Sequence, residues 1–296
     1  PLFDVMPMTP TSAKRLVVFH NVTPKELVPP QGRELIEKSI RQIANMIWAD
    51  YVLCDSRTNL DVLREEGVKT PSSVMPLAVA TDLRPPERKP GRDDGVVRIA
   101  FIGRFVKAKG PVELLSALRG IAGDPSAPRL HLDMIGNIDF SSQQVVAEVR
   151  AGIDEINATS DRLSVELHGN ASASKKTEVL TAADLFVLPT YHEGFCVPVI
   201  EAFASGCQVI TYCNSNLPSV CGGMATLVET GDQQALASAI LAGANHVSSA
   251  TWRDGGYAEF AARASAYVGA FSPEVIRRRF TAFVHDFAST PSIGAR

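Results

Sequence analysis

Short apolar runs alternate with longer segments of helical periodicity from residue 15 to residue 245. Each run is apolar at successive positions, as expected of a strand buried on both faces of a parallel sheet, and the helical segments supply the crossovers. Strands are predicted at residues 16–19, 51–53, 96–102, 130–135, 163–167, 185–188, 208–211 and 225–228. Helices are predicted at residues 33–48, 58–65, 112–119, 143–156, 175–182, 198–205, 257–270 and 274–287. This alternation predicts an α/β, doubly wound architecture.

A polar segment rich in Pro and Gly interrupts the pattern at residues 81–95 and is interpreted as an exposed linker. We expect a partial N-terminal Rossmann-like domain at 1–82, the linker at 83–95, a complete C-terminal Rossmann-like domain at 96–250, and helices that close the fold at 251–296. The few strands before the linker cannot form an independent sheet domain. They are interpreted as the second half of a domain whose first half is absent.

Composition narrows the class of protein. The 296 residues are 45% hydrophobic and 21% charged, with a formal net charge of −3, which excludes a disordered, collagen-like or coiled-coil protein. No stretch approaches the roughly 20 apolar residues of a membrane span, and the near-zero charge argues against a nucleic-acid binder. The five cysteines form no C-x-x-C pair, so we expect reduced, mostly buried thiols in a cytoplasmic protein. The start has neither an initiator Met nor a signal region, as expected of a processed or truncated chain.

The predicted helix at 33–48 is amphipathic, with apolar residues recurring at helical spacing. A crossover helix packed on its own sheet accounts for this pattern. An interfacial helix, peripheral at the inner face of a membrane, is the alternative.

The loop after the predicted strand 96–102 carries candidate chemistry. Gly103 and Arg104 follow the strand, and Lys109 precedes the next helix. A helix N-terminus offers unpaired N–H groups and partial positive charge, so with the two cations it predicts a cradle for an anion such as a diphosphate. The loop contains neither a P-loop nor a G-x-G-x-x-G motif. A basic, solvated loop remains the alternative.

Two carboxylates, Glu193 and Glu201, are separated by seven residues. Glu193 follows the predicted strand 185–188, and Glu201 lies in an otherwise apolar helix. A charge in such a helix needs a partner, and the hydroxyls of a ribose can donate hydrogen bonds to a carboxylate. The alternative is a helix-start Glu favoured by the dipole together with an unrelated loop Glu.

Together, Gly103-Arg104…Lys109-Gly110 and Glu193-Gly194-Phe195…Glu201-Ala202 resemble the retaining GT-B glycosyltransferases of family four, over about residues 15–231. The segment 49–56 is also similar to an element near the end of that family's N-terminal domain. The resemblance implies a GT-B-like fold, with an acceptor-side domain before the linker and a nucleotide-sugar donor domain after it.

The resemblance implies roles for individual residues. Arg104 and Lys109 match the basic pair that neutralises the donor diphosphate and the leaving nucleotide. Glu201 matches the Glu that binds the ribose hydroxyls, and Glu193 matches the Glu near the donor sugar. The backbone of Gly194, Phe195, Cys196 and Val197 would hold sugar hydroxyls and phosphate oxygens, although Gly is common in the family where Cys196 stands.

Two further residues are assigned by context. His20 matches a family His that ends an N-terminal-domain strand and faces the donor sugar, although a strand-end His is also often structural. Lys176 lies in a segment, 168–176, that resembles the loop beside the nucleobase, and a helix-capping loop with Ser172 or Ser174 as N-cap explains the same residues. His192 is expected to help shape the sugar pocket, while His131, His246 and His285 show no partner pattern.

The sequence therefore predicts a glycosyltransferase that transfers a hexose from a GDP- or UDP-linked sugar to a glycan or glycolipid acceptor with retention, in polysaccharide or lipopolysaccharide biosynthesis. No metal or other cofactor is expected, because no D-x-D motif or His/Cys cluster accompanies the nucleotide elements. A non-catalytic nucleotide-sugar-binding subunit, or a GT-B-fold nucleotide-sugar epimerase or phosphorylase, remains the alternative, although nothing marks the Schiff-base Lys of a phosphorylase.

Overall fold

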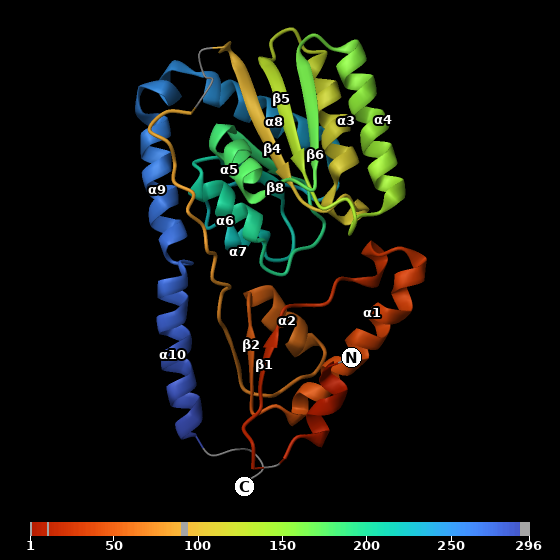
Figure 1. Ribbon diagram of the computed structural model, residues 1–296, viewed down its shortest axis with the longest axis vertical. Coiled ribbons are helices and arrows are strands. Elements are labelled where there is room, and N and C mark those ends of the chain that lie inside the picture. Colours follow the sequence, from red (N-terminus) through yellow and green to blue (C-terminus); the bar gives the residue numbers. More distant parts are fainter. Residues whose placement is uncertain (1, 11, 90–93, 291–296) are drawn as a thin grey trace. The chain divides into compact units, whose positions relative to one another are not determined.

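The computed structural model describes residues 2–10, 12–89 and 94–290 (Figure 1). The chain divides into two compact units. Unit 1 comprises Pro1–Ala80, His192–Phe195 and Ala270–Arg296, and unit 2 comprises Thr81–Tyr191 and Cys196–Gly269. The predicted domain boundaries at residues 82, 95 and 250 stay a prediction.

Unit 1 contains a three-stranded parallel sheet in the order β1-β2-β3, formed by Leu16–Phe19, Tyr51–Cys54 and Ser72–Val74. Its core is apolar and includes Phe19, Met46 and Leu63, each at most 2% exposed. Around the sheet lie α1 (Pro30–Gln42), α2 (Arg57–Glu65), α10 (Pro273–Ser289) and the 3₁₀ segments η1 (Leu2–Met8), η2 (Lys25–Leu27) and η3 (Ile43–Trp48).

The single helix predicted at 33–48 is two segments in the structure, α1 and η3. Pro30 stands at the first helical position, where its missing N–H costs nothing, so α1 begins earlier than predicted. In the tighter 3₁₀ winding, residues three apart face the same side, which directs both Ile43 and Met46 into the core. Leu35, Ile47 and Trp48 remain 57%, 61% and 46% exposed.

Unit 2 contains a six-stranded parallel sheet in the order β6-β5-β4-β7-β8-β9. The strands are β4 (Val96–Ile102), β5 (Arg129–Ile135), β6 (Leu163–Gly169), β7 (Leu185–Leu188), β8 (Gln208–Tyr212) and β9 (Thr226–Val228). The first strand of the unit, β4, pairs with both β5 and β7, so the strand order reverses there. Open α/β sheets bind ligands outside the carboxyl ends of the strands at such a switch point, where the loops after Ile102 and Leu188 begin.

The helices of unit 2 are α3 (Pro111–Ala122), α4 (Gln143–Thr159), α5 (Ala173–Ala182), α6 (Val197–Ala204), α7 (Leu217–Val220), α8 (Gln233–Ser248) and α9 (Tyr257–Gly269), with the short segments η5 (Lys107–Lys109) and η6 (Trp252–Gly256). Helix α3 packs against α4 and α8, and α6 packs against α9 (Figure 1). None of the helices in the described ranges is long and apolar enough to cross a membrane.

The predicted linker is not exposed throughout, because Leu83 is 6% and Lys89 only 2% exposed. The Lys89 ammonium donates to the main-chain oxygens of Leu180 and Thr181 at the end of α5, and to that of Ser205 after α6 at 2.5 Å. Helix C-termini carry partial negative charge and unpaired carbonyls, which a buried ammonium satisfies. Lys89 therefore ties the ends of α5 and α6 together. Residues 90–93 of the linker lie outside the described residues.

All five cysteines are free thiols. Cys54, Cys196, Cys207 and Cys221 are buried, and Cys213 is exposed. The prediction of mostly buried thiols is confirmed.

Candidate functional site

The loop after β4 is held in a fixed shape by its backbone. Gly110 adopts φ +62°, and a Cβ built there would lie 2.3 Å from the main-chain oxygen of Pro189, so only glycine fits. The Tyr191 amide donates to the oxygen of Ala108 at 2.8 Å. The loop after β4 and the start of the loop after β7 therefore lie against each other at the switch point.

The two cations predicted in this loop differ in their surroundings. Arg104 is exposed, and its side chain makes no hydrogen bond or ion pair with any part of the chain that the structure describes. Lys109 is half-buried at the end of η5, just before α3. An arginine with this much freedom offers its full set of donors to an anionic ligand.

A carboxylate that the sequence analysis did not single out lies beside this loop. Glu113, in the first turn of α3, accepts a hydrogen bond from the Tyr191 hydroxyl at 2.8 Å. Its Oε2 atom is buried and has no hydrogen-bond partner among the described residues. Burial raises the pKa of the Glu113 carboxyl, and burial beside this carboxyl raises the pKa of Tyr191 to about 12. A Glu in a first helical turn is so common that its sequence position gives no functional signal.

The predicted carboxylate pair is divided between the two units. Glu193 belongs to the segment His192–Phe195, which groups with unit 1, whereas Glu201 lies on α6 of unit 2. In unit 1, a Cβ on Gly194 would lie 2.9 Å from the main-chain oxygen of His20. The Phe195 ring packs edge-on against that of Phe271, with their centroids 5.7 Å apart. The structure thus brings Gly194 next to His20, two residues far apart in the sequence that the resemblance assigns to the donor.

Cys196 and Val197 lie at the beginning of α6. Cys196 has φ +76°, a left-handed conformation that residues with a Cβ adopt at a cost. Glycine adopts this conformation without strain, which explains physically why a glycine suits this position. Cys196 is only 5% exposed, and the burial of its thiol offsets part of the cost of this backbone conformation.

The carboxylate of Glu201 is paired within the chain. Glu201 is 8% exposed, and its Oε1 atom accepts from the Lys176 ammonium at 2.6 Å. Lys176 lies on α5, whose N-terminus is capped by the Ser172 hydroxyl, which accepts from the Lys175 amide. The buried Glu201 carboxylate is therefore paired with the Lys176 ammonium. Both residues were predicted to bind the donor, and the structure shows that they contact each other.

His20 directly follows β1 and is oriented by a buried carboxylate. Its Nδ1 atom lies 3.1 Å from Oδ2 of Asp55, and the imidazole itself is 60% exposed. The other carboxylate oxygen, Oδ1, accepts from the side-chain amide of Asn59. Burial raises the pKa of the Asp55 carboxyl, although the hydrogen bonds of His20 and Asn59 oppose that shift. A carboxylate on one ring nitrogen fixes the imidazole and leaves the other nitrogen for a ligand. Asp55 lies in the segment 49–56, whose resemblance to the family implied no role for this residue.

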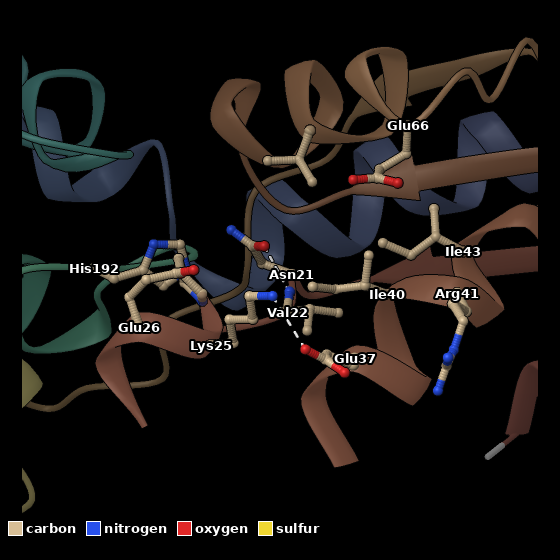
Figure 2. Close-up of a pocket in the computed structure, with 12 residues that line it drawn as sticks. Asn21, Val22, Lys25, Glu26, Glu37, Ile40, Arg41, Ile43, Glu66 and His192 are labelled. Atoms are coloured by element: carbon tan, nitrogen blue, oxygen red, sulfur yellow. Dashed lines mark hydrogen bonds and ion pairs between the residues drawn. The ribbon is translucent and has the colours of Figure 1, made fainter. Parts of the chain in front are cut away.

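Next to His20, unit 1 contains a pocket of about 460 Å³ (Figure 2). Charged side chains of both signs line this cavity together with His192. Its apolar lining residues include Val22, Ile40, Ile43 and Val62. Lys25 forms an ion pair with Glu37 at 3.1 Å. The charged lining residues are Lys25, Glu26, Glu37, Arg41 and Glu66. Such a mixed lining suits a polyhydroxylated molecule, and the scattered lining positions gave no pattern in the sequence.

A family model described as "Glycosyl transferases group 1" matches residues 85–243. Over 195 residues the chain is 27% identical to the MMP alpha-(1->4)-mannosyltransferase of Mycolicibacterium hassiacum, covering 64% of this chain and 42% of that protein. Over 233 residues it is 24% identical to the D-inositol 3-phosphate glycosyltransferase of Rhodococcus erythropolis, covering 76% of this chain and 48% of that protein. The chain therefore spans less than half the length of these curated relatives.

Two solved structures show the same fold. The sucrose-phosphate synthase from Thermosynechococcus elongatus superposes with a TM-score of 0.72 at 22% identity, over 93% of this chain and 68% of that one. A UDP-forming α,α-trehalose-phosphate synthase from Burkholderia xenovorans, solved with glucose-6-phosphate, gives 0.70 at 12% identity, over 98% and 71%. The predicted α/β, GT-B-like fold is confirmed.

Proposed function

Because the chain belongs to the glycosyl transferases group 1 family, we propose that it transfers a hexose from a nucleotide-diphosphate sugar to a glycan or glycolipid acceptor with retention. One observation carries the proposal. The segment matched by the family model, residues 85–243, contains all of the donor residues predicted from the sequence. These are Gly103, Arg104, Lys109, Lys176, Glu193, Gly194, Phe195, Cys196, Val197 and Glu201.

Arg104 and Lys109 are proposed to bind the donor diphosphate. Negative charge grows on the leaving phosphate as the glycosidic bond breaks, and fixed cations stabilise that charge more in the transition state than in the ground state. The exposure of Arg104 and its lack of a partner in the described residues support this role. The two side chains would supply the charge without a divalent cation.

Glu201 and Lys176 are proposed to bind the nucleoside. The ribose hydroxyls would donate to the Glu201 carboxylate, and Lys176 would contact the base. Since the two side chains are 2.6 Å apart, a nucleoside that engages either must share or replace that ion pair. Binding is thus an exchange of one set of charge-assisted hydrogen bonds for another.

His20 and Glu193 are proposed to act at the donor sugar, where positive charge develops at the anomeric carbon. Removing Glu193 should lower kcat more than it weakens donor binding, whereas Glu201→Gln should mainly raise the donor KM. The contact between Asp55 and His20 supports a positioned imidazole.

The pocket of unit 1 is proposed to bind the acceptor, because apolar side chains and charged side chains of both signs line it. A glycan, or the headgroup and adjoining chain of a glycolipid, fits that chemistry. We further propose that the chain acts in polysaccharide or lipopolysaccharide assembly in the cytoplasm. It would attach peripherally to the inner face of a membrane through the exposed Leu35, Ile47 and Trp48.

Calorimetric titration with UDP and with GDP in the presence of EDTA tests the donor site directly. Arg104→Ala should weaken binding by about 10- to 100-fold, since a charge-assisted contact contributes about 1.5–3 kcal/mol. Arg119→Ala is the matched control, because Arg119 is an exposed arginine of the same unit that pairs with Glu155. Equal binding by the parent and the Arg104 variant would refute the assignment, and loss of binding on chelation would refute the metal-free site.

A further inference from the structure

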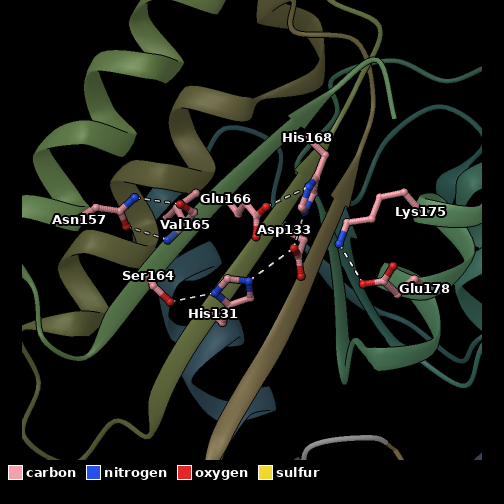
Figure 3. Close-up of polar contacts among 9 residues, drawn as sticks. All are labelled: His131, Asp133, Asn157, Ser164, Val165, Glu166, His168, Lys175 and Glu178. Carbon is pink, nitrogen blue, oxygen red and sulfur yellow. Dashed lines mark hydrogen bonds and ion pairs between the residues drawn. The ribbon is translucent and has the colours of Figure 1, made fainter. Parts of the chain in front are cut away.

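Two neighbouring strands of unit 2 present polar side chains on the same face of the sheet (Figure 3). His131 and Asp133 alternate along β5, and Ser164, Glu166 and His168 alternate along β6. The register pairs His131 with Ser164 and Asp133 with Glu166. Because side chains two apart point to one face of a strand, the five are gathered into one patch.

The imidazole of His131 is fixed at both ends. Its Nδ1 atom lies 2.8 Å from the Ser164 hydroxyl, and its Nε2 atom lies 3.4 Å from Oδ1 of Asp133. If Nδ1 donates its proton to Ser164, then Nε2 directs a lone pair toward the Asp133 carboxylate. Two electron-rich atoms in that arrangement call for a positive charge between them.

A second histidine also contacts Asp133. Asp133 is 8% exposed, and the Nε2 atom of His168 lies 2.6 Å from its Oδ1. Carboxylates that ligate a metal are themselves hydrogen-bonded by outer partners, and His168 is placed to be that partner of Asp133.

We propose that His131, Asp133 and Glu166 bind a Zn²⁺ ion, with His168 orienting the Asp133 carboxylate. One ligand atom from each of the three residues lies within 4.8 Å of the others. In a tetrahedral site with bonds of about 2.0–2.1 Å, two ligand atoms are about 3.4 Å apart, which the His131 and Asp133 atoms already satisfy. The Glu166 side chain is 60% exposed, and its Oε1 atom lies 3.4 Å from Nδ1 of His168. Rotation of this exposed side chain, with loss of that contact, would close the remaining distance. One imidazole with two carboxylates is a donor set that zinc accepts.

The site is open to an entering ion. The patch lines a pocket of about 380 Å³, whose opposite wall includes Lys175 and Glu178 of α5. These two residues form an ion pair with each other at 2.9 Å, so Lys175 is engaged by Glu178. The pocket leaves room for a water molecule as the fourth ligand, which is the arrangement of an open zinc site.

This inference does not depend on the proposed function. The residues lie within the strands, on the face of the sheet, whereas Arg104, Lys109 and Glu201 lie in or after the loops that follow the strands. The ion would bind where β5 and β6 meet and join them by a second set of bonds. Nucleotide binding therefore fails or succeeds independently of zinc binding.

The test is titration of the whole, chelator-treated chain with ZnCl₂ under reducing conditions, followed by calorimetry and by the melting temperature. We expect one Zn²⁺ per chain and a higher melting temperature, because binding to the folded state stabilises it. His131→Gln and Glu166→Gln should each weaken binding by at least about tenfold. A Co²⁺ titration of the same samples should give the visible absorption of a tetrahedral site in the wild type and lose it in both variants.

Two control variants separate this site from other ligands. Glu178→Gln removes an exposed carboxylate from the same pocket, and Cys213→Ser removes the exposed thiol. Both should bind Zn²⁺ like the wild type. Absence of stoichiometric binding would overturn the proposal and leave two histidines that satisfy a buried carboxylate. Equal binding by the wild type and the Glu166 variant, or loss of binding in the Cys213 variant, would overturn it as well.

Discussion

Each unit buries a charged side chain, and the two units satisfy it in different ways. In unit 2, the ammonium of Lys89 is held by main-chain oxygens at the ends of α5 and α6. In unit 1, the carboxylate of Asp55 is held by side chains, His20 and Asn59, of which His20 is largely exposed. Main-chain partners do not leave unless the helices move, whereas an exposed imidazole can respond to a ligand. Lys89 is therefore a scaffold residue, whereas Asp55 positions a side chain that we propose acts at the donor sugar.

The tryptophans allow this comparison to be measured. The chain has two, Trp48 in unit 1 and Trp252 in unit 2. Replacing either with Phe leaves the other as a fluorescence reporter of its own unit. The variants below are to be made in the background whose remaining Trp reports the unit concerned.

The largest effect is expected at Lys89. Lys89→Ala should lower the free energy of unfolding of unit 2 by about 3–5 kcal/mol, because it leaves a cavity and unsatisfied carbonyls. Lys89→Met restores most of the volume and none of the hydrogen bonds, and should remain at least about 1 kcal/mol below the wild type. Urea unfolding followed by Trp252 measures both. A Met variant as stable as the wild type would show that the ammonium is dispensable.

A smaller loss is expected at Gly110. Gly110→Ala adds a Cβ 2.3 Å from the Pro189 oxygen at a positive φ, and should cost unit 2 about 2–4 kcal/mol. Gly67 of unit 1 also has a positive φ but open space around it, so Gly67→Ala should cost only about 1 kcal/mol. Equal losses in urea unfolding would mean that the contact with Pro189 adds nothing to backbone strain.

The pH dependence of unit 1 should depend on Asp55. Since burial raises the pKa of its carboxyl, the folded chain keeps a proton that the unfolded chain has released. The free energy of unfolding should therefore fall as the pH rises from the ordinary carboxyl pKa toward the raised one, by at most about 1.4 kcal/mol per pH unit.

Unfolding of unit 1 across that pH window, followed by Trp48, measures the fall. Asp55→Asn should remove it, and Asp61→Asn, which changes a half-exposed carboxylate on the helix α2 that follows Asp55, should retain it. An Asp55 variant with the wild-type pH dependence would assign the fall to another group.

The smallest effect is expected at Cys196. Cys196→Gly loses a buried thiol but relieves a left-handed backbone, so the stability of unit 2 should change by less than about 1 kcal/mol. Cys54 is equally buried but lies in an extended strand of unit 1, and Cys54→Gly has no strain to relieve. Equal losses in the two glycine variants, compared by urea unfolding, would contradict the strain at Cys196.

Strands that are apolar on both faces were predicted closely from the sequence. Residues 16–19, 96–102 and 185–188 coincide with β1, β4 and β7. The strand β3 was missed because Ser72 and Ser73 are polar and the strand is short and only half-buried. Lys89 was placed in an exposed linker because the sequence does not show the helix-end carbonyls that hold it.

The loop residues of the candidate site could be predicted from the sequence, whereas the contacts between side chains on different elements could not. The positions of Gly103, Arg104 and Gly110 follow from the end of a strand and the start of a helix. The contact between Lys176 and Glu201 joins two helices, and no local pattern indicates it. The same holds for Asp133 and His168, which meet only through the register of two strands.

The capped start of α5 has a consequence for insertions and deletions. Ser172 fixes where this helix begins, and the adjacent Lys175 and Lys176 are turned about 100° from each other around its axis. One lysine therefore lies toward the patch of Asp133 and the other toward Glu201. Changing the length of the segment between Gly169 and Ser172 would leave both lysines in place. A single residue added inside the first turn would rotate both by about 100°, so that Lys175 took the direction of Lys176 and Lys176 turned away from Glu201. Loop length before the cap is therefore free to vary, and the spacing after it is not.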